Sequence, residues 1–535
     1  MSAQDVNLIA PACEAALVEA ALVFEQAAVR LHPEDDVAIA KISLPAGQTL
    51  RLPAEAGTVT LRDTIPAGHK FALRAVGRGQ AVRRYGQVIG TASADILLGA
   101  HVHTHNLLAQ PFERADTWSL EARPIPLVPP AERRTFLGYR RPDGRVGTRN
   151  VIAIIGTVNC SSHTVREIAH HFTPQRLKDY PNVDGVIALT HHGGCATRIG
   201  SLDYILLQRV LAGMARHPNV GACVLVGLGC EANQIADLVR NYRLSDGTTS
   251  LPMPLLTIQE EGGIRKTVQA GIAAVEDLLP LVNTTGRTPQ PVSELMVALQ
   301  CGGSDSWSGV TANPALGLAA DHLVQQGGSV VLAETPEIYG AEHLLVRRAI
   351  SSAVAEALMQ KVRWWEAHAA RLGMEIDNNP SPGNKVGGLT TIYEKSLGAI
   401  AKAGNSPLMG VFDYGAPVTA RGFSFMDSPG YDPVSVTGQV AGGCNVIAFT
   451  TGRGSVFGFK PTPCIKIASN SALYSRMADD MDMNAGRILD GEPIQRIADE
   501  LFDLMIAVAS GQQTKSEAQG VGEAEFNPWM TGGVL

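Results

Sequence analysis

The spacing of apolar residues divides the first quarter of the chain into three parts. An Ala-rich stretch predicts a helix over roughly Glu14–Val29, within an N-terminal extension of residues 1–34. Residues 35–106 then alternate short apolar runs with Pro-Ala-Gly and Gly-Arg-Gly turns, which is typical of a small all-β module. Residues 107–135 are proline-rich and have no period, so they indicate an extended linker.

From Phe136 onward, apolar runs alternate with helical stretches, which indicates α/β units built on mainly parallel sheets. The polar, proline-containing segment Leu281–Pro291 predicts the boundary between two such units, residues 136–285 and 286–535. The predicted helices include Ser162–Phe172, Leu202–Ala215 and Ala341–His368. The predicted strands are Val151–Gly156, Gly185–Leu189, Ala222–Gly227, Leu255–Ile258, Leu295–Leu299, Ser329–Ala333, Leu408–Phe412, Asn445–Thr450 and Ile465–Ala468.

Composition and charge restrict the class of protein. The formal net charge is −7 at pH 7, which argues against a general nucleic-acid binder because phosphate recognition needs a basic surface. No segment reaches the ~20 apolar residues that cross a bilayer, and the N-terminus lacks the pattern of a secretory signal. We therefore expect a cytoplasmic globular protein with no nucleic-acid or membrane partner.

Three cysteines follow predicted strands of the first α/β unit. Cys160, Cys195 and Cys230 each come after an apolar run, beside glycine or a polar residue. If these strands are parallel neighbours, the three thiols point into one crevice, where thiolates suit iron or zinc. The alternative is that small thiols only pack under tight turns. Four other cysteines have apolar neighbours and are expected in cores: Cys13, Cys223, Cys444 and Cys464.

The last unit opens with a second group of polar strand ends. The run LMVALQ is followed by Cys301 and a glycine-rich turn that carries Asp305, and the next strand ends in Glu334 and Glu337. Paired carboxylates at such a position can bind a metal or share one proton. Glu337 has an equally simple alternative, which is to favour a helix N-terminus through its charge.

Two cations and a group of histidines are further candidates. Asn384 and Lys385 lie on a proline-rich loop, where the lysine can act as a base, clamp an anion or be merely solvated. Arg453 follows a strand, and a guanidinium there is well shaped to grip a carboxylate. The β module contributes His69 and the alternating run His101, His103 and His105, which would share one strand face as a metal or substrate contact, or form only a polar edge.

The chain resembles the altronate/galactarate dehydratase family from about Asp36 to Leu535. Nine ordered motifs carry the resemblance: GHKFAL with GAHVHTHN, GYRRPDGRVGTRN, LTHHGGCA, GLGCEANQ, CGGSDSWSGVTANPALG, ETPEIYGAEHLL, NPSPGNKVGGLTTIYEKSLG, TGRGSVFG and MDMNAGRILDGE. The HVHTHN pattern is more similar to altronate enzymes than to galactarate enzymes. Two departures are Gly193, where the family usually has tyrosine, and residues 1–34, which have no obvious counterpart.

The resemblance implies both architecture and activity. It implies that the β module is a SAF (β-clip) domain, that the middle unit makes a homodimer and that the last unit is Rossmann-like. It also implies a need for ferrous iron and the elimination of water from a sugar acid, giving a 2-keto-3-deoxy acid. The iron would be mononuclear with mixed ligands, or part of an iron–sulfur cluster held by three thiolates, and other divalent metals can do similar Lewis-acid work.

The expected site residues follow from these arguments together. The expected metal ligands are Cys160, Cys195, Cys230 and Cys301. The expected catalytic residues are Lys385 as base, His191, Glu334 and Asp305. The expected substrate contacts are Arg453 as the carboxylate clamp, Asn384, His69, His103 and His105.

Several rival functions stay open at the level of sequence. Sulfolactate sulfo-lyases share the architecture and eliminate sulfite, and galactarate is an alternative substrate. An NAD(P)-dependent oxidoreductase is disfavoured, because the sequence Gly227-Leu-Gly229-Cys-Glu-Ala is not the dinucleotide-binding fingerprint. A protein that binds sugar acids without catalysis would form no keto acid even with Fe²⁺.

Overall fold

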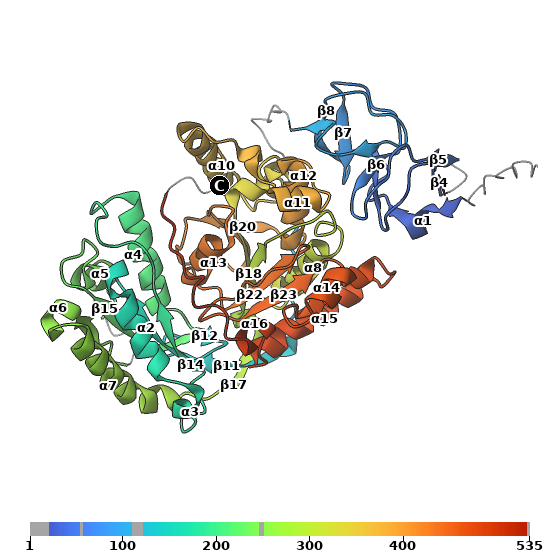
Figure 1. The fold of residues 1–535 in the computed structure, drawn as a ribbon. Helices are drawn as coiled ribbons and strands as arrows, with labels where there is room; N and C mark the ends of the chain where they lie inside the picture. The colour runs from blue at the N-terminus through green and yellow to red at the C-terminus, as the bar shows by residue number, and fades with distance from the viewer. Residues whose placement is uncertain (1–20, 54–56, 110–120, 246–250, 532–535) are drawn as a thin grey trace, which may run out of the picture.

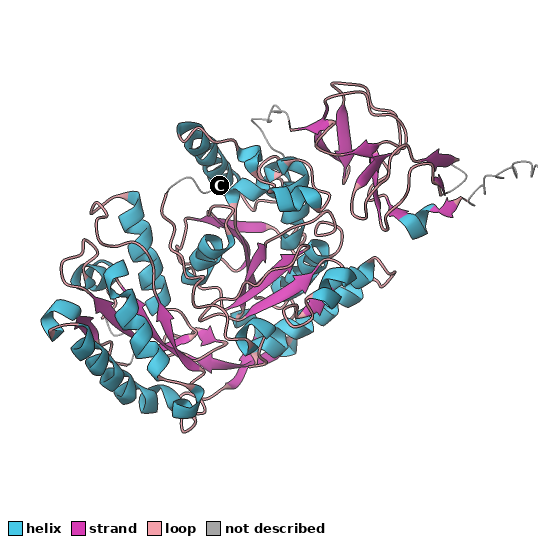
Figure 2. Ribbon diagram, viewed as in Figure 1, coloured by secondary structure: helices cyan, strands magenta, loops and turns pink. Residues whose placement is uncertain are grey.

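The computed structural model describes residues 21–53, 57–109, 121–245 and 251–531. An N-terminal β module (residues 21–109) lies to one side of two α/β regions, which pack against each other (Figure 1). Figure 2 shows that helices line both α/β sheets, whereas the module is almost entirely strand and loop. Among the described residues, no helix is both long and apolar enough to span a membrane.

Short strands build the N-terminal β module, which has three small sheets in the orders β1-β4-β5, β2-β3-β6-β9 and β10-β8-β7. The strands are β1 (Leu22–Val23), β2 (Ala28–Val29), β3 (Val37–Ala40), β4 (Thr49–Arg51), β5 (Thr58–Thr60), β6 (Lys70–Ala72), β7 (Ala81–Arg84), β8 (Gln87–Ala92), β9 (His101–Val102) and β10 (Leu107–Leu108). Because β10 pairs with β8, the sheet continues past residue 106 into the start of the predicted linker.

The helix predicted over Glu14–Val29 is wrong in its described part. Only α1 (Phe24–Ala27) is helical, and β2 pairs with β3 directly after it. Phe24 and Ala28 are buried with Phe71 in the core of the module, so tertiary packing there overrides helix propensity. The earlier part of the predicted helix lies outside the described residues.

The middle region is a parallel sheet in the order β14-β13-β15-β16. Its strands are β13 (Val151–Gly156), β14 (Gly185–Leu189), β15 (Val220–Gly227) and β16 (Leu255–Thr257). Helices α2 (Ser162–His171) and α7 (Ile264–Asn283) cover one face, and α4 (Leu202–Ala215) and α5 (Ile235–Tyr242) cover the other. Strands buried on both faces are apolar along their whole length, which is why VIAIIG predicted β13 correctly.

The segment predicted as a domain boundary is ordered. α7 runs through it to Asn283, and β17 (Thr288–Pro291) pairs with β11 (Thr135–Arg140), which in turn pairs with β12 (Val146–Gly147). This antiparallel ladder therefore ties the entry and exit of the middle region together.

The C-terminal region is built on a parallel sheet whose order, within the described chain, is β20-β21-β19-β18-β22-β23-β24. Its strands are β18 (Met296–Cys301), β19 (Ser329–Leu332), β20 (Leu408–Phe412), β21 (Gly422–Met426), β22 (Val446–Thr451), β23 (Cys464–Ala468) and β24 (Met483–Asn484). The chain leaves β18 toward β19 on one side and later returns to β22 on the other. The carboxyl ends of β18 and β22 thus flank a topological switch point, which is where open α/β sheets bind ligands.

Helices cover both faces of this sheet: α8 (Ala312–Gln325), α9 (Glu342–Val346), α10 (Ser352–Arg371), α11 (Pro382–Val386), α12 (Ile392–Ile400), α13 (Asp432–Ala441), α14 (Ser471–Arg476), α15 (Ile494–Ala509) and α16 (Lys515–Ala518). The single helix predicted over Ala341–His368 is wrong. It divides into α9 and α10, because Ala349 leaves the helix to form a bridge with Leu408.

The two α/β regions share a core. α4 of the middle region packs on α13, and a side chain at Gly213 would come 2.4 Å from the Ala441 carbonyl oxygen. Only glycine allows this approach of the two helices. The middle sheet is therefore fixed relative to the C-terminal sheet by close packing.

Candidate active site

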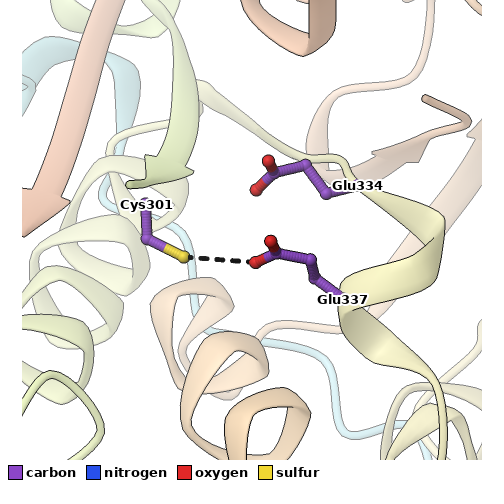
Figure 3. Close-up of side chains that lie close together, drawn as sticks. All are labelled: Cys301, Glu334 and Glu337. Carbon is purple, nitrogen blue, oxygen red and sulfur yellow. Dashed lines mark hydrogen bonds between the residues drawn. The ribbon is translucent and has the colours of Figure 1, made fainter. Parts of the chain in front are cut away.

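A buried group of acid and thiol side chains lies at the carboxyl ends of β18 and β19. Cys301 is the last residue of β18, and Glu334 and Glu337 follow β19 (Figure 3). One donor atom from each residue lies within 4.8 Å of the others. The Cys301 thiol is 3.7 Å from Glu337 Oε2. We call these three residues the Cys–Glu–Glu cluster; the parallel order of the strands brings them together.

Two lysines that the sequence did not single out flank this cluster. Lys402 Nζ lies 2.8 Å from Cys301 Sγ and 4.0 Å from Glu334 Oε2. Lys395 Nζ lies 2.7 Å from Glu337 Oε1. The available signal was that both lysines lie in the run IYEKSLGAIAKAG, whose other residues, apart from Glu394, are small or apolar.

Glu334 is the least satisfied member of the cluster. Both of its carboxylate oxygens are buried and lack a hydrogen-bond partner among the described residues. Its backbone is left-handed, with φ +71°, which is uncommon for a residue other than glycine. An unpartnered buried carboxylate costs free energy, and such costs concentrate at functional sites.

Burial and the neighbouring charges shift the pKa values of the three cluster members in different directions. Burial and the Glu337 carboxylate raise the pKa of Glu334 well above its ordinary value. Burial raises the pKa of Cys301 to about 11. Although burial opposes it, Lys395 and Lys402 lower the pKa of Glu337. Burial therefore favours the protonated forms of Glu334 and Cys301, whereas the two lysines favour the ionised form of Glu337.

Asp305 organises the turn that follows β18. Its buried carboxylate accepts hydrogen bonds from Ser308 N at 2.8 Å, Ser469 Oγ at 2.9 Å and Asn470 Nδ2 at 3.1 Å. Burial nevertheless raises its pKa. Because these donors come from the turn itself and from the end of β23, Asp305 is placed to fix the loop geometry at the switch point.

The predicted cations lie next to this turn. Asn384 Nδ2 donates to the Ser304 carbonyl at 2.7 Å and so ties α11 to the turn. A side chain at Gly387 would come 3.2 Å from Arg453 Cδ and 2.9 Å from Asp305 Cβ. The loop after Lys385 therefore lies against Arg453, whose guanidinium is exposed at the end of β22.

The four histidines of the β module form one cluster. The ring centroids of His69 and His103 are 4.9 Å apart, those of His69 and His101 are 5.2 Å apart, and those of His101 and His105 are 5.4 Å apart. His69 Nδ1 lies 3.1 Å from His101 Nε2. The imidazoles do gather on one side, but not along one strand face as predicted, because only His101 lies in a strand, β9, and His103 and His105 lie in the turn that follows it.

This histidine cluster docks on the loop that carries Lys385. His103 Nε2 donates to the Lys385 carbonyl oxygen at 2.9 Å, and His69 Nε2 donates to that of Val386 at 3.1 Å. The histidines, Lys385 and Arg453 thus surround one edge of the switch point. Because His69 and His103 each use one ring nitrogen to hydrogen-bond the docked loop, these histidines are less available as metal ligands.

Acidification is expected to weaken this docking. Burial and the neighbouring imidazoles lower the pKa of His101 to about 4, and burial with Lys70 lowers that of His103 to about 4. Between an ordinary histidine pKa of ~6.5 and ~4, the unfolded or undocked chain binds protons that the docked imidazoles do not, so stability falls as pH falls through this window. Thermal midpoints at about pH 7 and about pH 5 measure the loss.

The double variant His101→Asn/His103→Asn is expected to lose less thermal stability over the same pH change than the unmodified chain. The exposed His170, changed to asparagine, provides a control that should behave like the unmodified chain. An equal pH dependence in the double variant and the unmodified chain would contradict the assignment.

A buried ion-pair network makes the second contact between the β module and the C-terminal region. Lys70 Nζ lies 2.9 Å from the Glu394 carboxylate and 2.6 Å from the Gly388 carbonyl oxygen. The Arg84 guanidinium contacts the same carboxylate and donates to the Ser306 carbonyl at 2.8 Å. Although burial opposes it, Lys70 and Arg84 lower the pKa of Glu394 to about 2. No pattern in the sequence predicted this network.

The thiols predicted to form one metal set lie in two places. Cys160, Cys195 and Cys230 are exposed at the carboxyl edge of the middle sheet. Cys301, in contrast, is buried in the C-terminal sheet beside Lys402. The expectation of a single group of four thiols is therefore wrong, because the strands belong to two different sheets.

His191 lies under the middle sheet's loops rather than in the Cys–Glu–Glu cluster. Its Nε2 donates to the Gly156 carbonyl at 3.0 Å, and its Nδ1 accepts from Gly193 N at 3.1 Å. Burial lowers its pKa to about 4, so the ring stays neutral. Both nitrogens are occupied by backbone groups, which gives His191 a positioning role in the loop.

Fold and site together describe a multidomain α/β protein with a buried thiol–carboxylate cluster beside a switch point that a β module covers. Comparison with known families agrees along the chain. The altronate/galactarate dehydratase SAF domain matches residues 26–110. The second domain of D-galactarate dehydratase/altronate hydrolase matches residues 138–283, and the C-terminal domain of D-galactarate/altronate dehydratase matches residues 292–534. The chain belongs to the altronate/galactarate dehydratase family.

Individual relatives match from about three quarters of the chain to nearly all of it. Altronate dehydratase of Escherichia coli (strain K12) is 36% identical over 490 residues, which cover 91% of this chain and 96% of the relative. Galactarate dehydratase (L-threo-forming) of the same organism is 36% identical over 510 residues, which cover 94% of this chain and 96% of that relative. The (2R)-sulfolactate sulfo-lyase subunit beta of Chromohalobacter salexigens is 33% identical over 391 residues, which cover 72% of this chain and 95% of that relative.

Proposed function

We propose that the protein is a metal-dependent hydro-lyase that eliminates water from an altronate-like sugar acid and forms a 2-keto-3-deoxy sugar acid. Membership of the dehydratase family supports the reaction class. The observation that carries the chemistry is the Cys–Glu–Glu cluster, in which the buried Glu334 carboxylate has no hydrogen-bond partner among the described residues and lies 4.0 Å from Lys402 Nζ.

The donor set of this cluster fits one divalent ion, and we assign it Fe²⁺. A thiolate with two carboxylates is a mixed soft and hard set that suits ferrous iron. A divalent cation bound here would supply the counter-charge for the Cys301 thiolate and the Glu334 carboxylate, whose charged forms burial disfavours. A bound divalent ion would act as a Lewis acid toward the substrate carboxylate or its departing hydroxyl.

The protein's own groups have separate tasks in this proposal. Although burial opposes it, the thiol and the two carboxylates raise the pKa of Lys402, so this lysine keeps its proton. A fixed ammonium stabilises the negative charge that develops when the proton beside a carboxylate is removed. Arg453 grips the substrate carboxylate, the histidine cluster closes the edge of the site, and Lys385 stays the predicted base.

An anaerobic assay with added Fe²⁺ over a panel of aldonates and aldarates tests the proposal. Formation of a 2-keto acid from altronate is the expected result. Release of keto acid from galactarate alone would make galactarate the substrate, and release of sulfite from sulfolactate would assign the sulfo-lyase reaction. Binding of a sugar acid without any product would contradict a catalytic function.

Replacing Arg453 with alanine is expected to raise KM for the sugar acid by about 10- to 100-fold, because a charge-assisted hydrogen bond contributes about 1.5–3 kcal/mol. The iron content should not change, since Arg453 lies outside the Cys–Glu–Glu cluster. Steady-state kinetics with metal analysis measures both. Arg496→Ala, on the exposed face of α15, is the control. An unchanged KM in Arg453→Ala would rule out the clamp.

Finer features of the architecture belong to this proposal too. We expect the C-terminal region to be a Rossmann-like variant, given its parallel sheet with a central switch point. A homodimer through the middle region and a cytoplasmic location stay predictions. The predicted domain limits likewise stay predictions.

A further inference from the structure

Three exposed thiols gather at the carboxyl edge of the middle sheet, away from the site proposed above. β14, β13 and β15 are adjacent and parallel, and Cys195, Cys160 and Cys230 follow them in that order. All three are exposed, although free cysteine is among the most buried residue types. Three exposed cysteines on neighbouring strand ends therefore call for an explanation other than packing.

The loops that carry these thiols are bound to one another by backbone hydrogen bonds. Asn159 N donates to the Gly193 carbonyl at 3.0 Å, and Ala232 N donates to the Cys195 carbonyl at 3.1 Å. Gly194 has φ +96°, and a side chain there would come 2.5 Å from the Thr157 carbonyl oxygen. The loop after β14 can pass this close to the loop after β13 only with glycine at that position.

Buried polar side chains also hydrogen-bond to the same loops and hold them in place. Asn233 Nδ2 donates to the Thr157 carbonyl at 2.8 Å. The buried Glu231 carboxylate accepts from Gly229 N at 2.6 Å and from Thr157 Oγ1 at 3.1 Å. His191 fixes the loop after β14 through its hydrogen bonds to the backbone of Gly156 and Gly193. The thiols thus stand on a pre-organised frame, which is the requirement for a metal site of defined geometry.

The spacing of the sulfurs indicates the kind of ligand. Ile155 of β13 is in register with Leu189 of β14 and Leu225 of β15, so the three strand ends, and the loops that carry Cys160, Cys195 and Cys230, start from adjacent positions. Their sulfurs nevertheless do not all lie within 4.8 Å of one another. A single tetrahedral ion with metal–sulfur bonds of about 2.3 Å needs sulfurs about 3.8 Å apart.

The geometry points to a three-thiolate iron–sulfur cluster site formed by Cys160, Cys195 and Cys230. A cluster spreads its thiolate ligands over several irons and so suits wider spacing than one ion does. Gln259 Nε2 lies 3.5 Å from Cys230 Sγ and donates to it, and such hydrogen bonds to cluster sulfur tune reduction potential. With three protein thiolates, one iron of the cluster is left with a position for a solvent or small-molecule ligand.

This site is independent of the proposed dehydratase centre. It lies on the middle sheet, whereas the Cys–Glu–Glu cluster lies on the C-terminal sheet, and the two groups share no residue. Failure of one assignment therefore leaves the other standing. The two can be separated by acid-labile sulfide, which a mononuclear iron site does not contain.

Reconstitution of the full-length protein under anaerobic conditions, with ferrous iron, sulfide and a thiol reductant, tests the inference. We expect bound acid-labile sulfide and visible charge-transfer absorption in the unmodified chain. Each single variant Cys160→Ser, Cys195→Ser and Cys230→Ser should lose both signals. Cys223→Ala, which changes a buried thiol within β15, should keep them. Glu334→Gln should also keep the sulfide while losing the mononuclear iron.

Alkylation of the unmodified chain gives a measurement that does not depend on any variant. The three exposed thiols should react with iodoacetamide before reconstitution and be protected after it, as peptide mass spectrometry can quantify. Absence of sulfide after reconstitution would overturn the inference. Retention of the cluster in all three serine variants, or binding of one zinc ion by these thiols without sulfide, would overturn it equally.

Discussion

Glu334→Gln is expected to lower kcat/KM for the sugar acid by at least about 100-fold and to reduce the iron content of the protein in parallel. Outer-shell partners of metal ligands already contribute about 10- to 100-fold to metal affinity or activity, and the loss of a charged ligand should cost no less. The amide keeps the size of the side chain but cannot carry the negative charge that balances a divalent cation. Kinetics with Fe²⁺ and elemental analysis on the same preparation measure both effects.

The thermal midpoint of metal-free protein distinguishes this role from a structural one. Both Glu334 oxygens are buried without hydrogen-bond partners among the described residues, so the neutral amide should not destabilise the metal-free fold. Glu342→Gln changes another buried carboxylate outside the Cys–Glu–Glu cluster and should keep its iron. Full activity in Glu334→Gln, or an inactive variant that is simply unfolded, would contradict the assignment.

Glu394→Ala is expected to destabilise the docked β module by about 3–5 kcal/mol, because it leaves buried cations without their counter-charge. Lys70 and Arg84 are fully buried against this carboxylate. Because the chain folds as several packed regions, the effect is measured from resolved transitions rather than from one two-state unfolding free energy. Calorimetry that resolves the transitions should show the largest downward shift for the one that includes the β module.

Replacing the whole network with hydrophobic residues should restore the stability of the docked β module that Glu394→Ala loses. Replacing Lys70, Arg84 and Glu394 together with methionine or leucine removes all the charges at once, and such replacements are often neutral or stabilising. Glu356→Gln, in an exposed pair with Arg363, is the surface control and should shift the transitions little. If Glu394→Ala and this control behave alike, the network does not hold the module.

The parallel strands were the most predictable part of the fold. Val151–Gly156, Gly185–Leu189 and Leu408–Phe412 are found with the predicted limits, because each is a short, largely apolar run bounded by polar or glycine residues. The strand Gly422–Met426 was missed, since the short run GFSFM carries a polar residue at its centre. The helix break near Ala349 was also missed, because it depends on a bridge to a distant strand.

The site was predictable only in its strand-end members. Cys301, Glu334 and Asp305 stood out because polar residues after a buried strand lie at the carboxyl edge of a sheet. Lys395 and Lys402 did not, because charged residues on a helix are ordinarily expected in solvent. Every residue of α12 is in fact buried, because that helix lies between the C-terminal sheet and the β module.

The sequence by itself determined the types of most elements, the position of each thiol and carboxylate at a strand end, and the family. Only the tertiary structure decided which strand ends are neighbours. The four candidate cysteines divide into three on the middle sheet and one on the C-terminal sheet, and Glu394 meets two cations more than 300 residues away. The physical reason is that strand order is set by long crossover connections and by packing between layers, which local patterns of apolar and polar residues do not encode.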